Sequence, residues 1–422
     1  MQERLNTGLR RLLCAAALAA LAVPSAHASM LNTKHAFDGV NDGGNSLNGL
    51  IKVGNFFYGV TTTGGAHNLG TVFKMTASGA ITVLHSFAGG ADGATPRGEL
   101  VNVDGVDGSL YGTTLLGGSG GFCPAPMTTC GTVYKIDLPT SVESVVYTFQ
   151  GNLDGANPAA GLIYSGGVLY GTTLEGGNTY FGSCDTTYNS CGTVFSLTLG
   201  GTETVIHRFL GETAGDGANP FANLLAVGNK IYGLTTEGGA TCPHGLPNGC
   251  GTVFKLTPSG STWTEHIVHV FQTAADGGDP FAGLIKVGST LYGTTIFGGT
   301  DNDGVVYSIS LPSEAETVLY TFDGGANGSH PNSRLLNVGG TLYGMASGGG
   351  ISGCKYYYSY DGCGTIYQLV SGGIQTLYSF TGGLDGGNPF GSGGLVKKGA
   401  GLYSTTYGGG ADNFGTVFKF TP

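Results

Sequence analysis

The sequence predicts an all-β protein, a seven-bladed β-propeller with four strands per blade, and three observations support this. A two-part motif, Leu-Tyr-Gly-Thr-Thr-x-x-Gly-Gly and then, after a variable stretch, Gly-Thr-Val-Phe-Lys, recurs in seven versions along the chain. Each repeat holds four short runs rich in β-branched and aromatic residues, bounded by Gly, Asn, Asp or Pro. That pattern is typical of strands and turns. No helical period persists over ten residues beyond the N-terminal segment. Four strands at this repeat length match one propeller blade.

The motif marks the second and third strands of every blade. Its first half is centred on a tyrosine that recurs every 51 to 62 residues, at Tyr58, Tyr111, Tyr170, Tyr232, Tyr292, Tyr343 and Tyr403. Its second half starts at a glycine, at Gly70, Gly131, Gly192, Gly251, Gly304, Gly364 and Gly415. In the third repeat the four expected strands are residues 161–164, 168–173, 192–198 and 203–209.

The two ends of the chain are expected to share one blade. The last repeat stops after residues 415–419 and lacks a fourth strand. Residues 31–37 resemble the fourth strands of other repeats, such as residues 82–87. We therefore expect the N-terminal strand to complete the seventh blade and close the ring, which removes the exposed sheet edge of an open array.

The N-terminal 28 residues are expected to form a secretory signal peptide, and residues 29–422 a single propeller domain. Arg10 and Arg11 precede an apolar run too short to span a bilayer, and Ala26-His27-Ala28 reads as a cleavage site. Cys14 is a poor match to a lipoprotein cleavage box, and no later segment is apolar enough to cross a membrane. The prediction is a secreted or periplasmic protein without membrane insertion.

The charge balance excludes some partners. The chain carries 17 Lys+Arg and 27 Asp+Glu, a formal net charge of −10, which becomes about −12 without the signal peptide. An acidic chain repels phosphate backbones, so nucleic acid and anionic membranes are not expected as partners. The 81 glycines show no strict triplet period and indicate tight turns. We expect a monomer that needs no cofactor.

The loops between the second and third strands vary most and hold all eight cysteines that follow the signal peptide. The cysteines form four pairs, each inside its own loop, so we predict the disulfides Cys123–Cys130, Cys184–Cys191, Cys242–Cys250 and Cys354–Cys363. They require an oxidising compartment. A zinc site would need four convergent ligands, and His244 is the one loop histidine near a pair. Variable loops on a rigid scaffold usually carry binding or catalysis.

Two repeated features are predicted to be structural. An Asp-Gly-x-x-Pro motif, or one close to it, marks the crossovers between blades, with aspartates at Asp92, Asp154, Asp216, Asp276 and Asp385 and a partial copy at Asp42. These carboxylates suit either a ring of Ca²⁺ sites or turns in which Asp accepts backbone N–H bonds, and their repetition favours turns. The residue two positions before the Phe that follows each fourth strand is His in four repeats (His35, His85, His207, His269) and Tyr in three (Tyr147, Tyr320, Tyr378). An interchangeable position indicates packing.

Residues that break the symmetry are the candidates for chemistry. Glu175 and Glu237 precede the Gly-Gly doublet in neighbouring blades and form either an acid/base pair or two solvated surface acids. Arg97 and Arg334 both follow a crossover proline. They suit a clamp on a carboxylate or sulfate of an acidic glycan, or a local ion pair such as Arg97 with Glu99.

Aromatic residues in two cysteine loops are the candidates for ligand binding. They are Tyr180, Phe181, Tyr188, Tyr356, Tyr357, Tyr358 and Tyr360. Tyrosines held by disulfides suit sugar stacking or a protein contact, while the alternative is that they pack on one another. The sequence contains no Gly-x-Ser-x-Gly elbow, His-Glu-x-x-His motif, phosphate loop or dinucleotide fingerprint.

The unit Tyr-Gly-Thr-Thr-x-x-Gly-Gly … Gly-Thr-Val-Phe-Lys-Leu resembles the Gloeo/Verruco (GloVer) tandem repeat of secreted bacterial proteins, over nearly the whole chain after the signal peptide. The resemblance implies a secreted repeat protein and no particular activity. The period and the Gly-Gly doublet are also similar to kelch-type propellers. Kelch repeats carry a Trp, whereas Trp263 is the single one here, so a copper site of the galactose-oxidase type is not expected.

Two functions remain open from the sequence. The first is a binding or scaffold module that holds a glycan or protein on its disulfide-loop face. The second is a carbohydrate-active enzyme, a hydrolase or lyase, with Glu175, Glu237, Arg97 and Arg334 near the channel mouth. The absence of a recognisable catalytic motif favours the binding module.

Overall fold

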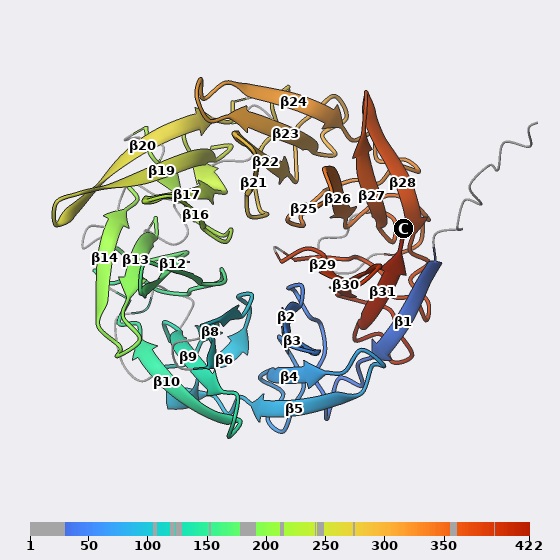
Figure 1. Cartoon of the computed structure of the whole chain (residues 1–422), viewed down its shortest axis with the longest axis horizontal. Helices are drawn as coiled ribbons and strands as arrows, with labels where there is room; N and C mark the ends of the chain where they lie inside the picture. The colour runs from blue at the N-terminus through green and yellow to red at the C-terminus, as the bar shows by residue number, and fades with distance from the viewer. Residues whose placement is uncertain are drawn as a thin grey trace, which may run out of the picture.

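A computed structural model describes residues 30–422 except 104–107, 119–122, 124–128, 152, 178–190, 212–214, 241, 243–248, 273–274, 355–360 and 392. Seven antiparallel blade sheets stand around a central axis, and each runs from an inner first strand to an outer fourth strand (Figure 1). Apart from the 3-10 turn η1 (Gly90–Asp92), the described residues form strands, turns and loops. The predicted all-β, seven-bladed propeller is confirmed.

The strands follow the predicted order in every blade. Blade 1 holds β2 (Ile51–Val53), β3 (Phe56–Thr61), β4 (Thr71–Met75) and β5 (Ile81–Ser86); blade 2 holds β7 (Val101–Asn102), β8 (Ser109–Leu116), β9 (Thr132–Asp137) and β10 (Val142–Thr148). Blade 3 holds β11 (Ile163–Ser165), β12 (Val168–Thr173), β13 (Thr193–Leu197) and β14 (Glu203–Arg208); blade 4 holds β16 (Leu225–Val227), β17 (Lys230–Thr235), β19 (Thr252–Ser259) and β20 (Thr262–Val270).

The remaining blades repeat this arrangement. Blade 5 holds β21 (Ile285–Val287), β22 (Thr290–Thr295), β23 (Val305–Ser310) and β24 (Glu316–Thr321); blade 6 holds β25 (Leu336–Val338), β26 (Thr341–Ala346), β27 (Thr365–Val370) and β28 (Gly373–Ser379). Blade 7 holds β29 (Val396–Lys398), β30 (Gly401–Thr406), β31 (Thr416–Thr421) and β1 (Met30–Ala36). Short strands at the crossovers are β6 (Ala94–Pro96), β15 (Gly217–Ala218) and β18 (Glu237–Gly238).

The N-terminal strand closes the ring as the repeat count predicts. Strand β1 pairs antiparallel with β31, so that Leu31 lies opposite Phe420 and His35 opposite Val417. Figure 1 shows this blue strand on the outside of the last, red blade. The pairing covers the edge that β31 would otherwise expose.

An aromatic contact joins every blade to the next. The Phe that follows each fourth strand packs edge-on against an aromatic ring of the third strand in the following blade, at centroid distances of 5.0 to 5.4 Å. The pairs are Phe37–Phe73, Phe87–Tyr134, Phe149–Phe195, Phe209–Phe254, Phe271–Tyr307, Phe322–Tyr367 and Phe380–Phe418. Edge-to-face pairs are favourable beyond their burial, so the repeated aromatic positions hold the blades together.

Threonines of the motif join the second and third strands. The last Thr of the second strand hydrogen-bonds the first Thr of the third strand through their buried hydroxyls, at 2.8 to 2.9 Å. This holds in five blades, for Thr61–Thr71, Thr114–Thr132, Thr173–Thr193, Thr235–Thr252 and Thr406–Thr416. The Gly-Thr-Thr and Gly-Thr-Val parts of the motif therefore meet in space, where the variable loop leaves the blade.

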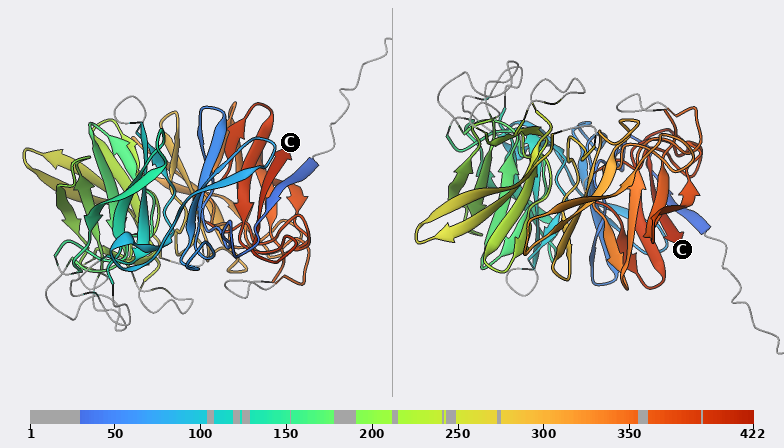
Figure 2. Two further views of the ribbon diagram at one scale, coloured as in Figure 1. Left: turned by 90° about the horizontal axis from the view of Figure 1, so that it is seen from below. Right: turned by 90° about the horizontal axis from the view of Figure 1, so that it is seen from above.

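The strand order defines two faces of the disc, which Figure 2 shows edge-on. The crossovers between blades and the loops between second and third strands lie at one face, here called the loop face. The turns between first and second strands and between third and fourth strands lie at the other, the turn face. No helix among the described residues has the length and apolar character needed to cross a membrane.

Candidate functional site

Large side chains from five blades meet at the central axis near the loop face. They come from the position that follows the crossover proline or its equivalent, and they extend from different blades toward the axis. Phe221 stacks on Phe281 at 3.9 Å between centroids, and Phe281 lies 5.4 Å from Phe390. Leu47 packs in the same cluster, and the guanidinium of Arg97 lies over Phe221 at 4.7 Å. We call these five residues the aromatic plug.

A polar network lies in the next layer of the channel. The Arg334 guanidinium from blade 6 donates to the Glu99 carboxylate from blade 2 at 3.0 Å and to the Gly393 carbonyl at 3.1 Å. The Asn223 amide from blade 4 donates to the other Glu99 oxygen at 2.8 Å. Burial raises the pKa of the Glu99 carboxyl, and the charge of Arg334 offsets part of that rise. The side chains tie blades 2, 4 and 6 together across the axis, and the Gly393 contact adds blade 7.

A pocket of about 350 Å³ lies beside this network, on its turn-face side. The first strands of blades 1 to 3 line it and contribute Lys52, Asn102 and Tyr164. Glu99, Asn223 and Arg334 line it as well. Its volume suits a small polar ligand. The pocket therefore lies toward the turn-face end of the channel, and the sequence analysis did not predict it.

The two predicted arginines are not equivalent in the structure. Arg97 directly follows its crossover proline and belongs to the aromatic plug. Arg334 lies three residues after its crossover proline, which is the repeat position of Glu99. Glu99 forms its ion pair with Arg334, which is 235 residues away. The suggested local pair of Arg97 with Glu99 is thus replaced by a contact between blades 2 and 6.

Glu175 and Glu237 occupy equivalent positions beside their crossovers. Backbone bridges join Glu175 to Ala156 and Glu237 to Ala218. Glu175 is only 7 % exposed, so the suggestion that it is a solvated surface acid is wrong. Glu237 is half-buried, and its charge acts on a different carboxyl group, that of Asp279. Neither glutamate stands free on the surface of the loop face.

Asp279 is a site residue that the sequence analysis missed. It precedes a crossover proline and has a positive φ of 55°, at a position where four other blades carry asparagine (Asn45, Asn157, Asn219, Asn388) and two carry Thr95 and His330. The Asn157 amide donates to the Leu115 carbonyl at 3.0 Å. Burial and the charge of Glu237 raise the pKa of the Asp279 carboxyl to about 7. The replacement of Asn by Asp before proline was the available signal.

The crossover aspartates act as turn residues, as their repetition suggested. Each of the six carboxylates accepts a backbone N–H from the turn at the end of its fourth strand, as in Ala88 N to Asp92 at 2.6 Å and Gln150 N to Asp154 at 2.9 Å. The His or Tyr of the fourth strand also contacts this carboxylate, as in Tyr147 Oη to Asp154 at 2.9 Å. The structural interpretation of the His/Tyr position agrees with these contacts.

Three predicted disulfides lie within the described residues. They are Cys123–Cys130, Cys242–Cys250 and Cys354–Cys363, with Cα–Cα distances of 4.9 to 5.2 Å. Cys191 is disulfide-bonded too, and its predicted partner Cys184 lies outside the described residues. So do the candidate ligand-binding residues Tyr180, Phe181, Tyr188, Tyr356, Tyr357, Tyr358 and Tyr360. Local disulfides of this kind fit an extracellular or periplasmic protein.

Comparisons with known proteins identify the repeat and the fold. The profile of the Gloeobacter/Verrucomicrobia repeat matches residues 24–184 and 178–358. No curated protein matches the sequence. Among solved structures, an oligogalacturonate lyase from Vibrio parahaemolyticus shares 12% identity, covering 93% of this chain and 96% of that one, with a TM-score of 0.52.

Two further solved structures show the same architecture. An oligogalacturonate lyase in complex with manganese shares 13% identity over 93% of this chain and 96% of its own, with a TM-score of 0.54. A putative 6-phosphogluconolactonase from Bacteroides uniformis shares 14% identity over 85% of this chain and 89% of its own, with a TM-score of 0.50. At these identities the likeness is one of fold.

Proposed function

We propose that this chain, which belongs to the Gloeobacter/Verrucomicrobia repeat family, is a secreted binding or scaffold module that holds a glycan or protein ligand on its loop face. The observation that carries the proposal is the aromatic plug. Its side chains meet across the axis at the loop face, and we infer that this face serves as a binding platform. Export would depend on the signal peptide expected over residues 1–28.

The contacts of the candidate catalytic residues support binding over catalysis. A catalytic site needs reactive groups that converge on one place a substrate can reach. Arg97 lies over a plug ring, and Arg334 shares its charge with the buried Glu99 carboxylate. Glu175 is buried beside its crossover. These groups stabilise the disc, and none of the three is arranged for attack on a ligand at the loop face.

Disulfide bonds and exposed apolar side chains suit the loop face to ligand contact. Disulfides limit the conformational entropy that a loop loses when it binds. Exposed apolar residues lie in the crossovers on the same face, at Val40 (64%), Leu153 (49%), Leu210 (47%) and Leu384 (74%). Ile351, which is 45% exposed, lies in the loop of the Cys354–Cys363 disulfide. Such side chains offer contact area without a cavity.

Two variants of blade 6 test which face binds. Ile351 precedes β27 on the loop face, and Val370 ends β27 at the turn face; their exposed fractions are 45% and 44%. Ile351→Glu should weaken binding of the full chain on a glycan array, or its capture of proteins exported by the source cells, by about tenfold, while the matched Val370→Glu should not. Equal loss in both variants, or loss in Val370→Glu alone, would contradict the loop-face assignment.

The second candidate, a carbohydrate-active enzyme, is favoured by the pocket on the turn-face side. Arg334 and Lys52 line it and could hold the carboxylate of an acidic sugar. The oligogalacturonate lyases of similar fold prompt the choice of substrate for its test. Release of reducing ends or unsaturated products from polygalacturonate, lost in Lys52→Ala, would support this second function and argue against a pure binding module.

A further inference from the structure

The outer rim of the disc repeats one contact at the junctions between blades. The His or Tyr near the end of a fourth strand reaches the crossover Asp that follows it. His85 Nε2 lies 3.0 and 3.2 Å from the two Asp92 oxygens, and His207 Nε2 lies 3.6 Å from Asp216 Oδ2. Tyr147 makes the corresponding contact in blade 2 through its hydroxyl.

The next blade adds a second carboxylate at some junctions. Blades 2 to 5 carry a glutamate six residues before the Phe that ends the fourth strand, at Glu143, Glu203, Glu265 and Glu316. In blade 1 the same position is Ile81, so the junction of His35 with Asp42 has no such carboxylate. Within the described part of the chain, two junctions bring one histidine and two carboxylates together, with ligand atoms all within 4.8 Å of one another.

The junction of blades 3 and 4 has the open arrangement that a metal ion requires. His207 Nε2 lies 3.4 Å from Glu265 Oε1, too far for a good hydrogen bond. Both atoms are buried and have no hydrogen-bond partner among the described residues. Backbone N–H groups of Leu210 and Gly217 hold the Asp216 carboxylate in place at 2.8 and 2.6 Å. The three ligand atoms therefore face one another and are fixed by the fold.

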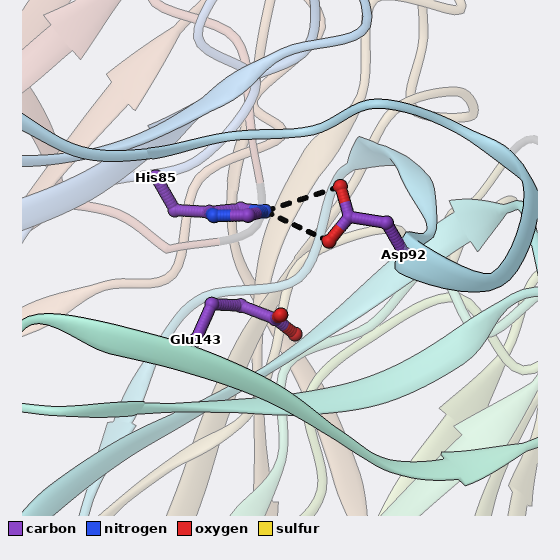
Figure 3. Close-up of side chains that lie close together, drawn as sticks. All are labelled: His85, Asp92 and Glu143. Carbon is purple, nitrogen blue, oxygen red and sulfur yellow. Dashed lines mark hydrogen bonds and ion pairs between the residues drawn. The ribbon is translucent and has the colours of Figure 1, made fainter.

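The junction of blades 1 and 2 carries the same set in a more closed form. Figure 3 shows the His85 ring pointing at both oxygens of Asp92, with the Glu143 carboxylate directed toward the same place from β10. All three side chains are half-buried. Two carboxylates this close repel each other in a partly buried site, and a cation between them would remove the repulsion.

We propose that the outer rim carries two equivalent sites for a divalent transition metal of the zinc class, formed by His85, Asp92 and Glu143 and by His207, Asp216 and Glu265. One imidazole nitrogen and two carboxylate oxygens form a ligand set that Zn²⁺ accepts, with water as the fourth ligand. Ca²⁺ prefers oxygen ligands alone, so the histidine argues against it. A metal there would join the outer strands of neighbouring blades.

The spacing of the ligand atoms agrees with this choice. Zinc bonds of about 2.0–2.1 Å at tetrahedral angles place neighbouring ligand atoms roughly 3.4 Å apart. The His207 distances of 3.4 and 3.6 Å match that value with little movement. In blade 2 the position of this histidine is occupied by Tyr147, whose hydroxyl donates to Asp154. That junction therefore offers no imidazole to a metal. That junction is a natural reference for a site that should not bind zinc.

Zinc binding by the metal-stripped full chain tests the proposal. Titration calorimetry with ZnCl₂ at pH 7 should give two equivalents per chain, and His85→Tyr or His207→Tyr should each lower this to one. Tyrosine already occupies this position in other blades, so these variants should fold, as checked by melting temperature. Glu265→Gln is a second variant that removes a ligand with a near-isosteric side chain and should also lose one equivalent.

The control is His35→Tyr, which changes a histidine at the same repeat position where the second carboxylate is missing. It should keep two equivalents. Failure of the wild-type chain to bind zinc would overturn the proposal, as would an unchanged stoichiometry in His85→Tyr and His207→Tyr. An equal loss in His35→Tyr would also overturn it, because binding would then not depend on the three-residue set. None of these outcomes measures the binding of a glycan or protein, so the proposed ligand-binding function is tested separately.

Discussion

A single aspartate in place of asparagine gives one crossover a pH dependence that the crossovers with asparagine lack. The amide of Asn157 donates to the Leu115 carbonyl, and the amides of Asn45 and Asn388 donate to the equivalent carbonyls of Tyr407 and Ser347. An ionised carboxylate cannot donate a hydrogen bond, so Asp279 could make the equivalent bond only when protonated. Its burial and the nearby Glu237 charge raise its pKa to about 7, so the carboxyl is protonated in acidic solution and loses its proton as the pH rises through about 7.

Asp279→Asn should therefore stabilise the protein at high pH more than at low pH. The carboxyl has a higher pKa in the folded chain than in the unfolded chain, so the free energy of unfolding falls as the pH rises from about 4 through about 7. Above pH 7 the penalty is on the order of a few kcal/mol, since one pKa unit corresponds to about 1.4 kcal/mol. Melting temperatures at pH 5 and pH 8 measure this.

The reciprocal variant is the control for this prediction. Asn157→Asp introduces the same carboxyl at an equivalent position that is 1% exposed, and it should lower the melting temperature more at pH 8 than at pH 5. A stabilisation by Asp279→Asn that is the same at both pH values would mean that Asp279 does not titrate in this range.

Which residue contacts could be predicted from the sequence depends on how far apart the partners lie in the chain. The disulfide partners sit within one loop, at separations of 7 to 9 residues in the three described bonds, so the repeat alone identifies them. Glu99 and Arg334 are 235 residues apart and meet because blades 2 and 6 face each other across the axis. No local pattern relates two such positions, and the ion pair emerges from the ring geometry.

At the scale of the strand and its loop, the Gly-Gly doublet is explained by close backbone packing. In blade 5 the first glycine of the doublet, Gly298, has a φ of +83°, and a Cβ there would lie 2.4 Å from the Cα of the crossover glycine Gly277. The bridge between Gly278 and Phe297 holds the loop and the crossover together at this point. The doublet is thus the point at which the backbone after the second strand contacts the crossover backbone directly.

Gly298→Ala should destabilise the protein far more than Gly288→Ala. Both glycines have positive φ, which costs an alanine about 1–2 kcal/mol. A Cβ at Gly288 meets nothing within 4 Å, whereas at Gly298 it also forces the backbone of the crossover to move, for a total loss of about 2–5 kcal/mol. Urea unfolding measures both losses. Similar losses in the two variants would show that strain in φ, and not packing, explains the doublet.

Most of the elements could be predicted because each blade is built from local hairpins. Strand runs, tight turns and the paired threonines all recur within one repeat, and the structure places them accordingly. The described pocket toward the turn face was not predicted, because its lining comes from several blades. The aromatic plug was not predicted either: Phe221, Phe281 and Phe390 occupy one position of the repeat, but their ring contacts arise only because blades 4, 5 and 7 face one axis.

At the scale of the whole molecule, stability depends on closing a ring whose last strand comes from the other end of the chain. Seven aromatic pairs link the seven blades, and one of them, Phe37–Phe73, exists only because β1 has joined blade 7. Phe37 and its internal counterpart Phe87 are both fully buried. They pack on rings of the next blade at 5.4 and 5.0 Å respectively. The closing junction is thus built like the internal ones.

Phe37→Ala should therefore lower the free energy of unfolding as much as Phe87→Ala, by about 3–5 kcal/mol, since each removes a fully buried ring. Denaturant unfolding of the full chain gives both values. If the N-terminal strand were a dispensable extension, Phe37→Ala would cost little while Phe87→Ala kept its full effect. An equal cost means that the junction between the first and last blades is as strong as the others. The ring then has no weaker junction at which neighbouring blades could separate, because β1 holds blade 7 to blade 1 as strongly as the other fourth strands hold their blades together.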